Sequence, residues 1–193
     1  MQNMINITRR TRKSIRCKNN EGGFTFIELM IVAAIIAILA VLAVPVLQGL
    51  YREYRAPYFA RDLARAVNTL QGAANTVATA TPYTGVTTAT LASALKDTAF
   101  SVSGAAATHS IQATGLAPQA VAVTGTPGAN LVITVSKVHE KACMPMLTQM
   151  VRVAESIKVG TTPVKVAGAQ PAIATLQSAC AVPAGADIEY TIQ

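Results

Sequence analysis

A single carboxylate, Glu28, lies near the start of a long apolar run, and its position gives it the clearest chemical significance in this sequence. The run begins at Phe24, directly after Gly23, and the next charged residue after Glu28 is Arg52. About 20 apolar residues span a bilayer, so the run predicts a transmembrane helix. Where water is scarce a carboxylate attracts a positive group strongly, although desolvation offsets much of the gain. An acid near one end of a membrane span is costly, so Glu28 is a candidate functional residue by default.

No other group of residues has the spacing of a catalytic or metal site. His109 and His139 are isolated in strand or loop contexts, and no Ser–His–Asp order or phosphate-binding loop stands out. Asp187 and Glu189 alternate along a predicted strand and so share a face. That face is either solvated or part of a cation site, which two carboxylates alone do not complete. We therefore predict that the chain is not an enzyme and uses no metal or other cofactor.

Positive charge is concentrated at the N-terminal end. Residues 1–23 carry +5 of the formal net charge of +7, which leaves +2 for residues 24–193. Because Lys and Arg stay on the cytoplasmic side of a membrane, the N-terminus is predicted to face the cytoplasm and the C-terminal part to lie beyond the membrane. The near-neutral remainder predicts no nucleic-acid partner.

The cysteines follow the same division. Cys17 precedes the apolar run, whereas Cys143 and Cys180 lie in the part predicted to be extracytoplasmic, where disulfides are favoured. A bridge between them would close a loop of about 37 residues and stabilise the fold by about 3.8 kcal/mol on a chain-entropy model. The alternatives are two free thiols or a metal site, although two distant cysteines without a CxxC pair lack zinc spacing.

One long helix is expected to carry Glu28 near its start. Residues 24–50 are apolar on every side, and residues 51–80 become amphipathic, which indicates one face for burial. The apolar positions of that face are Tyr51, Tyr54, Tyr58, Leu63, Val67, Leu70, Ala74 and Val77. A helix of about 50 residues would be about 75 Å long, which suits a first half that packs on copies of itself and a second half that packs on a head domain.

Arginines occupy the other positions of the amphipathic half, and their roles differ. Arg61 and Arg65 are expected on a solvated helix face. Arg52 and Arg55 lie nearest the bilayer, so contacts with lipid headgroups or with acids of neighbouring copies stay open for them. Within the helix, Pro45 and Pro57 are expected to produce kinks or local openings.

Residues 81–193 are expected to form a small globular head. Strands are predicted at 100–103, 110–113, 119–124, 130–138, 155–159, 163–166 and 187–192. Short helices are predicted at 91–95 and over the segment that contains Cys143, with a helix or loop at 171–180. One long helix followed by mixed strands and short helices predicts an α+β fold with a small antiparallel sheet packed on the helix.

The N-terminal pattern resembles the prepilins of type IV pili and their relatives in type II secretion. The resemblance rests on Gly23, Phe24, Thr25 and Glu28 behind a basic leader. It implies that a dedicated membrane peptidase cuts between Gly23 and Phe24, removes residues 1–23 and methylates the new amine. Counted from Phe24, Glu28 is then the fifth residue, where the family carries an acid that pairs with the amine of an incoming subunit.

The resemblance extends to two further features. It implies a hinge from Pro45 to Gly49, for which a simple kink is the alternative. The segment between Cys143 and Cys180 is similar to the disulfide-bounded region of type IVb pilins, whereas Phe24 is more typical of type IVa. An ordinary signal peptide or a plain membrane anchor would explain the apolar run, but neither explains the Gly–Phe junction together with the acid.

These observations predict a type IV pilin precursor that is stored in the inner membrane and then polymerised into an extracellular fibre. The implied partners are other copies of the chain, the prepilin peptidase and N-methyltransferase, the pilus assembly machinery and membrane lipid. The alternatives are a minor pilin, a type II secretion pseudopilin, or a DNA-uptake or adhesive pilin. The sequence does not distinguish a fibre that moves cells from one that adheres, takes up DNA or serves conjugation.

Overall fold

The computed structural model describes residues 24–77 and 79–193 of the chain. Within these residues there are four helices and seven strands, and a long N-terminal helix precedes an antiparallel sheet. The α+β fold predicted from the sequence is therefore confirmed. The chain divides into two compact units, with the boundary after Val41.

Helix α1 (Phe26–Ala74) contains both predicted halves and is continuous through Pro45 and Pro57. Its N-terminal part is long and apolar enough to cross a membrane, and that stretch is not buried against the rest of the protein. The helix ends at Ala74, earlier than the boundary near residue 80 that the sequence suggested, because a turn begins at the next residue.

The buried face of α1 begins later than the sequence predicted. Tyr51, Tyr54 and Tyr58 were expected in the core but are exposed, and the buried positions start at Ala56 and Phe59. Stepping back from buried Leu63 by three or four residues reaches Phe59 and Ala60 rather than Tyr58, so the tyrosines fall on a different side of the helix. Val77 is also exposed, because it lies beyond the end of α1.

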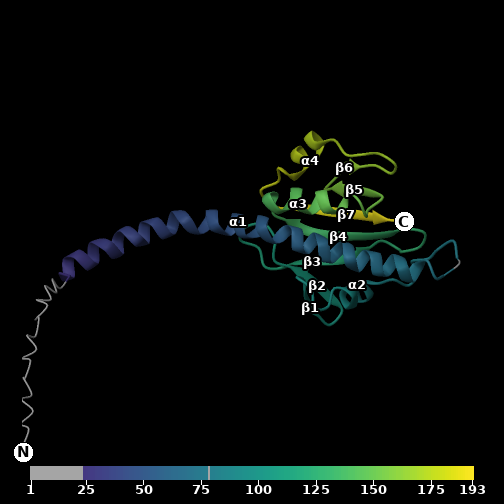
Figure 1. Cartoon of the computed structure of the whole chain (residues 1–193), viewed down its shortest axis with the longest axis horizontal. Helices are drawn as coiled ribbons and strands as arrows, with labels where there is room; N and C mark the ends of the chain where they lie inside the picture. Colours follow the sequence, from purple (N-terminus) through teal and green to yellow (C-terminus); the bar gives the residue numbers. More distant parts are fainter. Residues whose placement is uncertain (1–23, 78) are drawn as a thin grey trace, which may run out of the picture. The chain divides into compact units, whose positions relative to one another are not determined.

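The seven-stranded sheet has the order β1-β2-β3-β4-β7-β5-β6 over the described residues, and all neighbouring strands are antiparallel. Its strands are β1 (Ser101–Ser103), β2 (Ala106–His109), β3 (Gln119–Thr124), β4 (Leu131–Val138), β5 (Ser156–Val159), β6 (Thr162–Lys165) and β7 (Ala186–Ile192). Burial alternates along β7, so one face of the sheet is covered and the other is half-exposed. The second half of α1 lies across the covered face (Figure 1) and shares one core with the strands.

Three short helices complete the head, namely α2 (Thr88–Ala94), α3 (Glu140–Met150) and α4 (Ile173–Cys180). Their buried residues belong to the same core as α1 and the sheet. Helix α3 begins at Glu140, so Pro145 lies in its second turn. It therefore leaves the carbonyl of Lys141 without its usual helical donor.

One predicted strand is wrong. Residues 110–113 were expected to form a strand, but only Gln112 pairs, in an isolated bridge with Val138. The strand lies instead at β2, which forms a hairpin with β1 around Gly104. Gly104 has a φ of 59°, which suits the two-residue turn that reverses the chain there.

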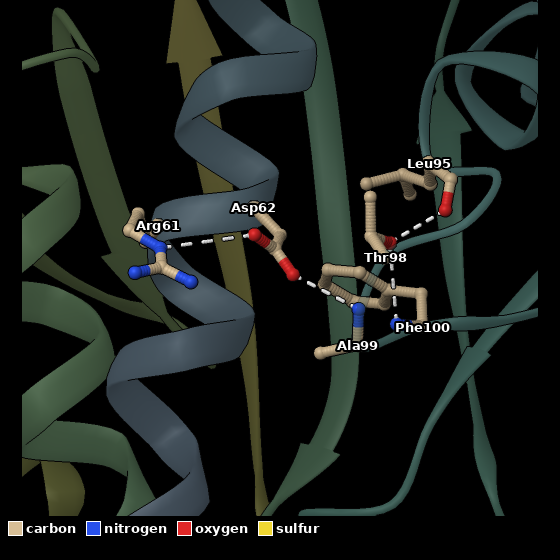
Figure 2. A network of polar contacts seen from close by, with 6 residues as sticks. All are labelled: Arg61, Asp62, Leu95, Thr98, Ala99 and Phe100. Atoms are coloured by element: carbon tan, nitrogen blue, oxygen red, sulfur yellow. Dashed lines mark hydrogen bonds and ion pairs between the residues drawn. The ribbon is translucent and has the colours of Figure 1, made fainter.

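Asp62 ties the segment between α2 and β1 to the long helix. This buried carboxylate accepts a hydrogen bond of 2.9 Å from the backbone N–H of Ala99, and its other oxygen lies 3.9 Å from Arg61 Nε (Figure 2). Thr98 donates to the carbonyl of Leu95 and accepts from the N–H of Phe100. Phe100 is thereby placed edge-on to Phe59 of α1, with ring centroids 5.0 Å apart.

Candidate functional site

The residues around Glu28 form the start of helix α1. Thr25 precedes the helix, and its Oγ1 accepts a hydrogen bond of 3.3 Å from the N–H of Glu28, while its carbonyl accepts from the N–H of Leu29. Thr25 is thus the N-cap, and Glu28 is the third helical residue. Thr and Glu three residues apart are the residues of a capping box, which marks the N-terminus of a helix. This signal was visible in the sequence but was not used above to place the helix start. The observed bond uses the backbone N–H of Glu28, and the Glu28 side chain lies in the first turn of the helix.

The predicted cleavage junction is only partly within the described residues. Phe24 is described and exposed, whereas Gly23, Cys17 and the whole basic leader lie outside the described residues. Cleavage between Gly23 and Phe24 and methylation of the new amine stay predictions. An acid in the first turn, as Glu28 is, interacts favourably with the positive end of a helix dipole.

The candidate hinge is helical in the structure. Pro45 and Gly49 both lie within α1, and Gly49 is buried. A Cβ added to Gly49 would lie 3.3 Å from Lys141 Nζ, so the absence of a side chain lets the Lys141 side chain of α3 lie close against α1. Gly49 thus has a packing role that is separate from flexibility, and a hinge at these residues stays a prediction.

The late cysteines lie at disulfide distance. Cys143 of α3 and Cys180 of α4 form a bridge with Cα atoms 5.6 Å apart and a sequence separation of 37. The bridge joins α3 and α4, and strands β5 and β6 lie between these two helices in the sequence. It therefore bounds a C-terminal region of the head, although its formation in the cell stays a prediction.

Both histidines have structural partners. His109 is buried, its Nε2–H donates to the carbonyl of Ser136 over 2.7 Å, and its Nδ1 accepts from the N–H of Ile111 over 3.3 Å. Burial lowers the pKa of His109 to about 4, so the ring is neutral at pH 7. His139 caps α3 through a bond from the N–H of Lys141 to its Nδ1, and burial also lowers its pKa. Both rings thus hold backbone in place.

Asp187 of the last strand is held by Lys137 of β4. Asp187 accepts hydrogen bonds from the N–H and the Nζ of Lys137, at 2.8 and 3.2 Å. Lys137 has a φ of 52° and lies where the β4–β7 register shifts, so Asp187 fixes an irregular part of β4. Over residues 24–77 and 79–193 there is no group of three or more His, Cys, Asp or Glu side chains able to hold a metal ion.

Arg52 and Arg55, whose contacts the sequence did not determine, lie against the head. Arg52 Nη1 donates to Thr114 Oγ1 over 2.9 Å, and Arg55 Nη1 donates to Tyr51 Oη over 2.8 Å. Arg55 also lies 3.5 Å from Ser110 Oγ. Both side chains therefore contact hydroxyl groups of the same chain.

Comparison with known families places one motif on this chain. Residues 18–44 match the family model described as the prokaryotic N-terminal methylation motif. The match covers Phe24, the capping residue Thr25 and Glu28, and it ends just before Pro45. No curated protein and no solved structure matches the chain.

Proposed function

We propose that this chain, which its methylation motif makes a type IV prepilin-like protein, is a structural subunit of a type IV pilus. The motif implies processing by a prepilin peptidase and assembly into pili. The observation that carries the proposal is the coincidence of that motif with the start of one long helix whose apolar part is unburied. The proposed role is non-enzymatic.

The exposed surface of α1 supports assembly with other copies. Large apolar side chains from Phe24 to Leu50 are exposed, and the exposed stripe of Tyr51, Tyr54 and Tyr58 follows them. A surface of this kind requires cover, either by lipid or by protein. Membrane lipid covers the apolar part before assembly, and neighbouring helices cover it in the fibre.

Glu28 supplies the register of assembly in this proposal. Cleavage after Gly23 would create a positive amine at Phe24, and Glu28 of a subunit already in the fibre would attract it. Because desolvation offsets much of the Coulomb energy, the pair acts on register more than on affinity. The precursor stays in the inner membrane with its head on the periplasmic side until that step.

Mass spectrometry of sheared surface filaments tests the proposal. The dominant species is expected to begin at Phe24, to be heavier by one methyl group, and to be lighter by two hydrogens for the Cys143–Cys180 bridge. A processed chain that is found in the membrane but not in filaments would identify a minor pilin or pseudopilin instead. A chain that keeps residues 1–23 would show that the assigned junction is wrong.

A further inference from the structure

A pocket of about 380 Å³ lies beside α1 at the β1–β2 edge of the sheet. Arg55 of α1 lines it, together with Phe100, Ser101, Thr108, Ser110 and Pro118. Ligand pockets in proteins measure about 300–1,000 Å³, so this one is large enough for a single small molecule. Ser101 and Pro118 on its rim are exposed, whereas Phe100 at its base belongs to the helix–sheet core.

Arg55 brings a positive charge to this pocket without an acid to balance it. The side chain is half-buried, and no carboxylate among the described residues lies within 4.0 Å of its nitrogens. A partly buried guanidinium without a counter-charge is costly. Its Nη1 alone has hydrogen-bond partners in residues 24–77 and 79–193, so Nε and Nη2 keep donors for an oxyanion.

The guanidinium of Arg55 is held in position before any ligand arrives. The hydroxyl of Tyr51 accepts from it at 2.8 Å, and its central carbon lies 5.4 Å from the ring centroids of both Tyr51 and Phe59. These contacts restrict the rotamers of Arg55 before a ligand binds. Binding therefore costs less side-chain entropy, and this preorganisation favours affinity.

The remaining walls offer hydroxyl groups and an apolar surface. Thr108 Oγ1 donates to the carbonyl of Ser101, and Ser110 Oγ lies beside Arg55. Phe100 supplies the apolar wall, and the bond from Ala99 to Asp62 holds the segment that carries it (Figure 2). His109 also lines the pocket, but both of its ring nitrogens are engaged with backbone.

We propose that this pocket binds an acidic sugar of monosaccharide size, with its oxyanion on Arg55 and its hydroxyl groups on Ser101, Thr108 and Ser110. A planar guanidinium with free donors pairs with carboxylate and with phosphate. Hydroxyl-rich walls beside an apolar ring suit a sugar, which has polar edges and an apolar face. Carboxylate and phosphate share this chemistry, and the test below separates them.

Titration of the isotopically labelled full chain in detergent micelles, followed by NMR, tests the proposal. The probes are glucuronate, glucose 6-phosphate and glucose. We expect at least one acid to shift the amide signals of residues 99–110 saturably, and glucose to bind at least about tenfold more weakly, because a hydrogen-bonded charge pair contributes a factor of this order. Arg55→Gln should weaken binding of the acid by a similar factor.

Two further variants separate binding from folding. Arg52→Gln removes a neighbouring arginine of α1 that does not line the pocket, and it should bind as the wild type does. Ser101→Leu narrows the pocket from an exposed strand position and should abolish binding even if Arg55→Gln is poorly folded.

Several results would overturn the proposal. They are an absence of saturable shifts with both acids, equal binding of glucose, or unchanged affinity in Arg55→Gln and Ser101→Leu. Loss of filaments in Arg55→Gln, with no binding of either acid by the wild type, would show that a carboxylate of a second copy fills the pocket. Because binding is measured on unassembled chain, the result does not depend on the proposed pilus function.

Discussion

At the scale of single residues, one substitution separates the two roles proposed for Glu28, in helix capping and in assembly. Glu28→Gln keeps the side-chain type that a capping box accepts but removes the charge. If the charge sets assembly register, the variant should be processed and inserted normally and form few or no filaments. Filament yield by shearing and immunoblotting measures this.

The matched control acts on the helix start alone. Thr25→Ala removes the cap at Oγ1, which costs about 1 kcal/mol locally, but it leaves the charge of Glu28 in place. We expect it to assemble. Filaments in Glu28→Gln and none in Thr25→Ala would show that capping, rather than the charge, is what assembly requires.

His109 makes the stability of the head depend on pH. Its pKa is about 4 in the fold and about 6.5 when unfolded, so the unfolded chain takes up a proton first as the pH falls. Its contribution is complete above pH 6.5 and declines by about 3 kcal/mol between pH 6.5 and 4. Protonation at Nδ1 would also break the bond from Ile111.

Urea unfolding of the chain in micelles between pH 7 and 4 measures this decline. His109→Gln should be less stable at pH 7 and show a shallower pH dependence. The pKa of His139 is also lowered in the fold, so His139→Gln serves as the comparison. An undiminished slope in His109→Gln would assign the effect to other groups.

At the scale of elements, α1 has two glycines that allow a controlled test of the hinge. Gly49→Ala adds a Cβ that the flexible end of Lys141 can avoid, and it should favour the helix by about 1 kcal/mol. If residues 45–49 open during assembly, the variant should be at least as stable as the wild type yet yield fewer filaments.

Gly72→Ala is the control, because its added Cβ meets no atom within 4 Å and lies in the same helix. Thermal unfolding and filament yield are measured for both. Wild-type filament yield in Gly49→Ala would remove the support for a hinge and leave Gly49 with its packing role.

The elements also show which parts of the fold the sequence could predict. The β-branched residues of β3 and β4 and the long apolar pattern of α1 indicate their own conformations, and these strands and the helix are confirmed, although the tyrosines of α1 are not buried. The β2 segment, Ala-Ala-Thr-His, has no such signal, and its pairing depends on the turn at Gly104. The capping role of Thr25 was missed although its spacing to Glu28 was visible. The pocket at Arg55 depends on contacts between distant segments.

At the scale of the whole molecule, the bridge between α3 and α4 is expected to contribute strongly to the stability of the head. Replacing Cys143 and Cys180 by Ser should lower the free energy of unfolding by about 3.8 kcal/mol, which is the chain-entropy value for this loop. Urea midpoints under non-reducing conditions measure the change.

Cys17→Ser in the precursor is the control and should leave the midpoint unchanged, since that residue lies in the predicted leader, outside the head. Equal midpoints for the double variant and the wild type would show that the bridge does not form or does not constrain the unfolded chain.

Strand β7 has a consequence for how the protein is made. It pairs with β4 on one side and β5 on the other, so the middle of the sheet is vacant until residues 186–192 have been synthesised. A ribosome that stalls before this point, or a protease that removes it, leaves two open strand edges and no continuous sheet. A chain without β7 would therefore expose the edges of β4 and β5, and such edges invite pairing with other chains.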